Sequence, residues 1–207
     1  MAATAALRRD GRTIAVRRAR LEDVPAIAGV LARAFDDDPL FRILLPDERV
    51  PRLTRFFEAA LPIVHLPLGE VWVTDDLRAA AAWAPPGRWH VSALQQLRML
   101  PMIGVFRGNT LFGARMHRVV EREHPRDPHW YLSTLGVDPS AQGRGLGAAV
   151  LGPVLSRCDL ERVDAYLESS NEQNHAFYRK QGFELRQTLE FPRSARVWTM
   201  RRPPRGA

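Results

Sequence analysis

The chain has 207 residues, of which 45% are hydrophobic and 26% are charged, and this balance is typical of a globular protein with one well-filled domain. Its formal net charge of +7 comes from 30 basic residues, of which only Lys180 is a lysine. Because the arginines are dispersed and no recognised nucleic-acid motif is present, we expect no specific nucleic-acid partner. The alternative of an RNA-associated protein is supported only by the net charge.

The chain also lacks the signals of a membrane or secreted protein. No apolar run reaches the length of about 18 residues that suggests a membrane span, so no membrane partner is expected. Arg8 and Arg9 are not followed by the apolar stretch of a secretion signal. The one cysteine, Cys158, cannot build a disulfide framework and suits a reducing cytoplasm. No basic partner is evident for it, so we interpret it as a packed side chain.

The first half of the chain is predicted to mix strands and amphipathic helices. Residues 1–11 are small, basic and aperiodic, which predicts a disordered tail before a single domain over residues 12–203. A strand is expected at residues 13–18 and a helix at residues 21–35, with Arg20 as a poor cap. Further elements are helices at residues 49–66, 91–105 and 110–122, and a hairpin of strands at residues 70–74 and 79–84.

The second half predicts a β-α-β unit. Strands at residues 130–137 and 162–168 flank a helix at residues 144–158, so the two strands should be parallel with a right-handed crossover. Residues 183–191 and 196–201 suit a final antiparallel pair. The expected architecture is therefore one mixed sheet of about seven strands flanked by helices.

A glycine-rich turn follows the strand expected at residues 130–137. Residues 142–147 read Gln-Gly-Arg-Gly-Leu-Gly and lead into an apolar helix. Glycines let N–H groups approach a ligand, and a helix N-terminus adds unpaired donors and the positive end of a dipole. These features predict a cradle for phosphate oxygens. The spacing fits neither a Walker A loop nor a dinucleotide fingerprint, and an ordinary strand-to-helix turn is the alternative.

A second motif comes after the strand expected at residues 162–168. Residues 171–183 predict a short helix that stops at Gly182. Asn171 precedes Tyr178 by seven residues, about two helical turns, so we expect both side chains on roughly the same side of this segment.

The two motifs together resemble the GNAT superfamily of acyltransferases. The first fits Q-x-x-G-x-G with Gln142, Gly145 and Gly147, and the second fits an Asn followed by Phe-Tyr and then Gly-Phe. The resemblance implies an α/β fold of the mixed α+β type, the GNAT fold, in which two parallel strands of the central sheet splay apart. It also implies direct transfer of an acetyl group from acetyl-CoA, as co-substrate and without a metal, to an amine.

The resemblance covers nearly the whole chain and is strongest over residues 129–203. Within the superfamily it points to the puromycin N-acetyltransferases, but it is weak over residues 86–128, where we expect the acceptor to be chosen. The segments that carry it are residues 71–76, 130–134, 167–170 and 196–200.

The resemblance also implies where acetyl-CoA binds. Main-chain groups of the motif strand and of the glycine-rich turn would hold it, and the alternatives for Gln142 and Arg144 are a turn-stabilising amide and a solvated charge. The implied cofactor-binding residues are Leu135, Gly136, Val137, Gln142, Gly143, Arg144, Gly145, Leu146, Gly147 and Asn171.

Two residues are the candidates for proton chemistry. Tyr178 is implied as the general acid, with a core tyrosine as the alternative. A thiol has a pKa of about 8.5 and a phenol a pKa of about 10, so full proton transfer from Tyr178 to the thiolate is uphill by roughly 2 kcal/mol. A hydrogen bond from Tyr178 to the leaving sulfur is expected instead. Glu168 is the best base candidate, with a structural carboxylate as the alternative. No histidine falls on the strand at residues 130–137, and we expect His175 to point to solvent.

The acceptor side is less defined. Asp36, Asp37 and Asp38 follow the first helix, and they either attract a cationic amine or cap and end helices. An apolar pocket, or simply core, is expected from Trp83, Trp89, Met99, Met102 and Met116.

The leading hypothesis is an N-acetyltransferase that acts on a primary amine of a small molecule, with antibiotics among the candidates. A protein N-acetyltransferase and a non-catalytic acyl-CoA sensor are the alternatives, since a fold does not fix a function. A homodimer is one arrangement that the sequence allows.

Overall fold

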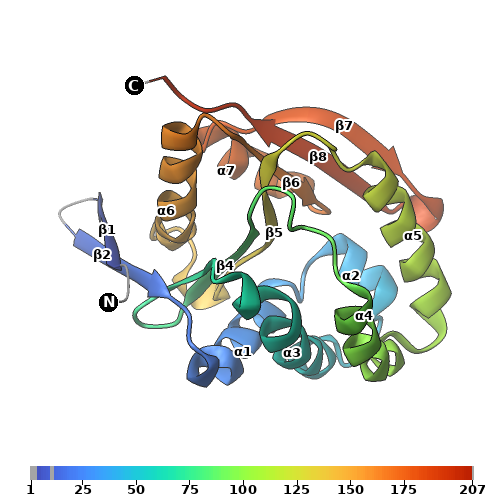
Figure 1. Ribbon diagram of the computed structural model, residues 1–207. Coiled ribbons are helices and arrows are strands. Elements are labelled where there is room, and N and C mark those ends of the chain that lie inside the picture. The colour runs from blue at the N-terminus through green and yellow to red at the C-terminus, as the bar shows by residue number, and fades with distance from the viewer. Residues whose placement is uncertain (1–3, 10–11, 207) are drawn as a thin grey trace.

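The computed structural model describes residues 4–9 and 12–206, and these residues build one mixed sheet of eight strands (Figure 1). Across the sheet the order is β1-β2-β3-β4-β5-β6-β8-β7, and only the β5–β6 pair is parallel. The strands are β1 Thr4–Arg9, β2 Arg12–Arg18, β3 Val71–Thr74, β4 Ala79–Ala84, β5 His129–Val137, β6 Asp164–Ser169, β7 Glu184–Glu190 and β8 Arg196–Arg202.

Helices cover both faces of this sheet, and Figure 1 shows α6 on one side with α1 and α3 on the other. Alternate residues of β4 explain this, because the pleat turns Ala81 and Trp83 toward α6 but Ala80 and Ala82 toward α1 and α3. The helices are α1 Val24–Ala34, α2 Pro39–Leu44, α3 Arg49–Ala60, α4 Ala93–Met99, α5 Thr110–Glu123, α6 Leu146–Glu161 and α7 His175–Lys180.

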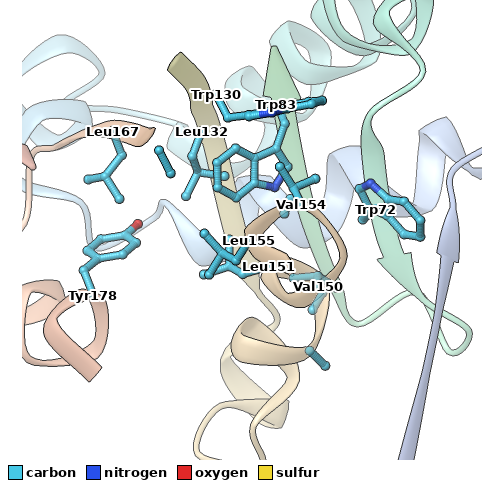
Figure 2. Packing of buried hydrophobic residues seen from close by; sticks show 14 of the residues in the cluster. Trp72, Trp83, Trp130, Leu132, Val150, Leu151, Val154, Leu155, Leu167 and Tyr178 are labelled. Carbon is cyan, nitrogen blue, oxygen red and sulfur yellow. The ribbon is translucent and has the colours of Figure 1, made fainter. Parts of the chain in front are cut away.

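The core on the α6 side is closely filled. Figure 2 shows Trp83 and Trp130 packed over Leu151 and Leu155 of α6. In the same picture Tyr178 of α7 lies at the margin of this cluster, with its hydroxyl turned toward the side where Leu132 and Leu167 lie. The core therefore fixes α6 and α7 against the two parallel strands.

The parallel strands β5 and β6 separate part of the way along their length. Their pairing runs from His129 with Asp164 to Leu132 with Leu167. Ser133 is then an extra residue in β5, because Leu132 faces Trp83 of β4 while Thr134 already faces Ala82. Such a bulge bends its strand and increases the local twist. Beyond it, residues 134–137 pair only with β4, so the splayed pair expected from the sequence is confirmed.

Most predicted elements are present, with some changes at their ends. Thr4–Arg9, predicted as part of a disordered tail, forms β1 and pairs with β2; residues 1–3 and 10–11 lie outside the described residues. The sequence missed α2, which begins at Pro39 with Asp38 as its N-cap. The predicted helix at 49–66 ends as α3 at Ala60 and continues as a π-helix, Leu61–His65. Pro62 explains the change, since it lacks the N–H of a regular helical turn.

Within residues 4–9 and 12–206, no helix combines the length and the apolar character that crossing a bilayer requires.

Candidate active site

The edge of β5 that faces the gap carries main-chain groups that no described strand pairs with. The Asp138 N–H donates to the Arg78 carbonyl at 2.8 Å, so the N–H groups of Gly136 and Thr134 point toward β4 as well. The N–H and C=O groups of Leu135 and Val137 therefore point the other way, where β6 has turned aside and no described strand pairs with them. This edge can bond to the amides of an extended ligand, as a further strand would.

The glycine-rich turn has the conformation of an anion cradle. Gly143 and Gly145 adopt φ values of +77° and +83°, which are favourable for glycine, and α6 begins directly after them. Among the described residues, none accepts a hydrogen bond from the main-chain N–H groups of residues 143–148. Six unpaired main-chain donors thus lie at or just before the positive end of a 16-residue helix.

The turn is anchored by Asp138, whose role the sequence did not reveal. Its carboxylate accepts from the Arg33 side chain at 2.7 Å and from the Ser140 N–H at 3.0 Å. The Ser140 hydroxyl and then Arg33 hold the pKa of Asp138 well below its usual range, so the group is ionised throughout the physiological range. The residues that approach a ligand here are thereby fixed to α1.

The predicted cofactor residues differ in where they point. Gly145 and Leu146 lie at the start of α6, and Arg144 is exposed beside them. Gly136 instead faces α1, because an added Cβ would lie 2.7 Å from a methyl carbon of Leu31. The missing side chain of Gly136 therefore lets α1 pack closely against β5 and does not make room for a ligand.

Gly147 is a packing position as well. A Cβ at Gly147 would lie 3.2 Å from the Phe177 ring and 3.4 Å from Val137. The Gln142 side chain donates to the Val137 carbonyl at 3.4 Å, as in the turn-stabilising alternative. Leu135 and Val137 pack partly against the core on the α6 side.

Asn171 lies outside the helix that carries Tyr178, contrary to our expectation of one helical segment. It caps a short 3-10 turn, Glu172–Asn174, by accepting from the Gln173 N–H at 3.0 Å. Its side-chain oxygen is therefore engaged, and only its NH₂ group is left to reach a ligand.

A cavity of 610 Å³ opens where β5 and β6 separate. A cavity of this size suits a small molecule. Its floor is β5 and the end of β6, and its walls come from α2, α3, α5, α7 and the segments around residues 99–106. Most polar lining residues come from β5, the end of β6 and the segments beside them, namely Asp38, Tyr131, Ser133, Thr134, Glu168, Ser169, Ser170, Asn174 and Tyr178. The other polar lining residues are His65, Thr110 and His117.

Tyr178 lines this cavity while most of its side chain is buried. Only 7% of the residue is exposed, and its ring packs edge-on against Phe177 and Phe183. Burial, and after it the negative charge of Asp38, raise the pKa of Tyr178. The phenol therefore stays protonated at physiological pH and is a hydrogen-bond donor.

Of the three predicted aspartates, only Asp38 lines the cavity. It caps α2 by accepting from the Leu40 and Phe41 N–H groups, and it also accepts from the Ser170 hydroxyl at 2.5 Å. Asp36 and Asp37 pair instead with Arg49 and Arg42 and are not part of the lining. Asp38 thus caps a helix, which is one of the two alternatives that the sequence left open, and it also faces the cavity.

Glu168 lines the cavity and belongs to a chain of hydrogen bonds. Its Oε1 lies 2.9 Å from Nδ1 of His124, and Nε2 of His124 lies 2.9 Å from Nε2 of His129. His129 continues the chain through Nδ1 to the Asp127 carbonyl at 2.7 Å. Trp89 stacks on His124 with 3.8 Å between ring centroids.

The chemistry of the partners fixes the protons in this chain. The Asp127 carbonyl can only accept, so Nδ1 of His129 carries a proton and donates it. Burial lowers the pKa of His129, so its ring is neutral and its Nε2 must accept from Nε2–H of His124. The contact between His124 and Glu168 then requires one shared proton, because two lone pairs facing each other at 2.9 Å would repel.

Two expectations about histidines were wrong. β5 begins at His129, one residue before the predicted strand, so a histidine does lie on the motif strand. His175 is buried against Trp198 rather than pointing to solvent, and its Nε2 has no hydrogen-bond partner among the described residues. His65, which the sequence did not single out, lines the cavity, and burial lowers its pKa to about 4.

The apolar residues proposed for a pocket divide into two groups. Met99, Met102 and Met116 line the cavity, whereas Trp83 is fully buried in the core and Trp89, which stacks on His124, is not part of the lining. Cys158 is also fully buried, and burial raises the pKa of its thiol to about 12, as expected for a packed side chain.

Within the described part of the chain, no group of three or more His, Cys, Asp or Glu side chains is arranged to hold a metal ion.

Comparisons with known proteins agree with this geometry. The model of the Acetyltransferase (GNAT) family matches residues 54–183. An uncharacterized N-acetyltransferase of Schizosaccharomyces pombe is 27% identical over 206 residues, covering 87% of this chain and 78% of that protein. A mycothiol acetyltransferase of Salinispora arenicola is 32% identical over 156 residues, covering 64% of this chain and 50% of that protein. The chain thus spans about half the length of this mycothiol acetyltransferase.

Solved structures show the same fold. A Corynebacterium glutamicum structure described as "histone acetyltransferase HPA2 and related acetyltransferase" is 25% identical, with a TM-score of 0.70 over 93% of this chain and 97% of that chain. Arylalkylamine N-acetyltransferase 2 of Aedes aegypti is 12% identical, with a TM-score of 0.62 over 92% of this chain and 98% of that chain, and shares the fold.

These relatives support the superfamily expected from the sequence but not its finer resemblance to puromycin N-acetyltransferases. The family model covers more than half of the chain, and the sheet has the splayed parallel pair expected of that family. The chain therefore belongs to the GNAT family of acetyltransferases and is an N-acetyltransferase.

Proposed function

We propose that this enzyme acetylates the primary amine of a small molecule. The observation that carries the proposal is a single cavity of 610 Å³ that contains Tyr178 and Glu168 and touches Leu135 on the open edge of β5. Its volume fits a small acceptor, and its position brings such an acceptor beside the edge where we place acetyl-CoA.

The residues present fit acetyl-CoA as the co-substrate, which supplies an acetyl group activated as a thioester. We assign its diphosphate to the free N–H groups of the turn at residues 142–147, with Arg144 adding positive charge. Leu135 and Val137 offer main-chain groups to its amides, and Asn171 offers its side-chain NH₂. A main-chain N–H of this edge is also suited to polarise the carbonyl that is attacked.

Glu168 is the proposed base. It faces the cavity, and its side chain is 9% exposed. It would therefore take a proton from the ammonium group of the acceptor at a site that is shielded from bulk water. His124 acts on Glu168 rather than on the acceptor: it orients the carboxylate and shares a proton with it. His129, fixed as an acceptor, in turn orients His124.

Tyr178 is the proposed donor to the leaving sulfur. Because its pKa is raised, complete transfer of its proton to a thiolate is even less favourable than for an ordinary phenol. A hydrogen bond to the developing thiolate, or relay of a proton that comes from the amine, is the role that its chemistry allows.

A thiol-release assay tests the function. Purified enzyme with acetyl-CoA is offered small primary amines, puromycin as an antibiotic, and a peptide with a free N-terminus. We expect amine-dependent release of coenzyme A with at least one small amine. Coenzyme A binding without release on any amine would favour a sensor, and release with the peptide alone would favour a protein N-acetyltransferase.

We also place the reaction in a reducing compartment such as the cytoplasm, because the one cysteine of the chain, Cys158, is a free and buried thiol.

A further inference from the structure

We propose that the acceptor is an amphipathic monoamine, with its ammonium group near Asp38 and an aromatic or alkyl tail extending toward Phe106, and that diamines and polyamines are poor acceptors. This inference rests on the proposed function and names the class of its substrate. It follows from how charge and apolar surface are distributed along the cavity.

Asp38 is a buried carboxylate without a cation. It is 6% exposed and accepts hydrogen bonds from two main-chain N–H groups and from the Ser170 hydroxyl. Among the described residues, none forms an ion pair with it, and burial raises its pKa. A buried carboxylate is most stable beside a positive charge, and an ammonium group bound in the cavity would supply one.

A continuous row of phenylalanine rings leads away from Asp38. The row starts at Phe41 and Phe35, whose ring centroids are 5.5 Å apart, and Phe35 is tied to Asp38 because its carbonyl accepts the Asp38 N–H. It continues to Phe57 at 5.8 Å, to Phe56 at 5.5 Å and to Phe106 at 5.6 Å. All five rings line the cavity. Such a wall binds an apolar tail through burial of surface and contacts between rings.

The far end of the cavity offers no partner for a second positive charge. Among the described lining residues, the only carboxylates are Asp38 and Glu168. Both lie at the strand end, because Ser170, which bonds to Asp38, comes two residues after Glu168 on the segment that ends β6. The segment that carries Phe106 adds Met99, Met102 and Ile103 to the lining. Thr110 also lines the cavity, and its hydroxyl donates to the Arg107 carbonyl at 2.8 Å.

A second ammonium group at this end would therefore lie against apolar side chains without a counter-charge, which is unfavourable compared with an apolar tail. His65 adds no repulsion against the first ammonium group, because its pKa of about 4 keeps its ring neutral.

Matched amines test the inference in the thiol-release assay. n-Hexylamine and 1,6-diaminohexane have the same length and differ in the charge at the far end. We expect kcat/KM to be at least about 100-fold higher for n-hexylamine. Among n-alkylamines from butyl to hexyl, kcat/KM should rise about fourfold for each methylene that is buried. Equal or better turnover of the diamine would overturn the inference while leaving the proposed function intact.

A charge placed at the far end provides the second test. Met102 is partly buried at that end, so Met102→Glu adds a carboxylate and Met102→Gln is the matched neutral control. We expect Met102→Glu to lower the preference for n-hexylamine over the diamine at least about tenfold, and Met102→Gln to leave it within about twofold. An unchanged preference in a folded Met102→Glu enzyme would contradict the proposed direction of the tail. No turnover of any amine would overturn the proposed function and this inference together.

Discussion

Oε1 of Glu168 lies 2.9 Å from Nδ1 of His124, although 44 residues separate them in the chain. Glu168 comes from the end of β6, while His124 directly follows α5 and is held by stacking on Trp89. The contact therefore depends on how α5, which forms one wall of the cavity, packs relative to the sheet. It couples the proposed base to the segment that also shapes the acceptor pocket.

Replacing Glu168 by Gln should lower kcat by roughly 100-fold or more, because the amide keeps the shape but cannot take a proton. Steady-state rates measured from pH 5 to 10 should also lose the acidic limb of the wild-type profile. Glu172→Gln, on an exposed turn close by, is the matched control and should behave like wild type. An acidic limb that survives in the Glu168 variant would remove this residue from the role of base.

Removing the Tyr178 hydroxyl should slow turnover by roughly 10- to 1000-fold, because the leaving sulfur loses its donor. Tyr178→Phe keeps the ring that packs against Phe177 and Phe183, so the melting temperature should change little. The affinity for coenzyme A, measured by calorimetry, should also stay close to the wild-type value. Near-wild-type turnover would leave Tyr178 as a packing residue.

Reversing the charge of Arg144 should weaken coenzyme A binding roughly tenfold at low salt, because a carboxylate would replace a cation beside the diphosphate. The effect should shrink in 0.5 M salt, where exposed charges are screened. Arg186→Glu makes the same charge change on the exposed edge strand β7 and serves as the control. Equal affinities for both variants in calorimetric titrations at low salt would show that Arg144 is a solvated charge.

His65 should make the folded enzyme sensitive to mild acid. Its pKa is about 4 in the fold against 6.5 for an ordinary histidine, so between these values the unfolded chain binds more protons. The free energy of unfolding should therefore fall as the pH drops from about 6.5 toward 4. Urea unfolding of His65→Gln should show a smaller fall over this range, whereas His117→Gln, at an exposed position, should follow wild type. Parallel curves for all three proteins would show that His65 is not the source.

Local patterns allowed much of the fold to be predicted. The β-α-β unit, the glycine-rich turn and the final hairpin are encoded by residues close together in the chain, so their periodicity and turn residues reveal them. The missed helix α2 has only six residues and depends on its Asp38 cap, too short a segment to show a periodic pattern. β1 was missed because its stability comes from pairing with β2 rather than from its own pattern.

The site could be predicted only where one motif contains it. Tyr178 and Glu168 end up beside one cavity, but the role of His124 depends on the position of the wall that follows α5. Asp36, Asp37 and Asp38 are neighbours in the chain, and only the local direction of each side chain decides that Asp38 faces the cavity while the other two pair with arginines. Sequence adjacency could not make that distinction.

A crystal structure of the enzyme with coenzyme A tests the central claim most directly. We predict the diphosphate within hydrogen-bonding distance of the N–H groups of residues 143–148, the pantetheine amides on the edge of β5 at Leu135 and Val137, and the sulfur within reach of the Tyr178 hydroxyl. A diphosphate bound elsewhere, or a sulfur directed away from the gap between β5 and β6, would contradict this prediction.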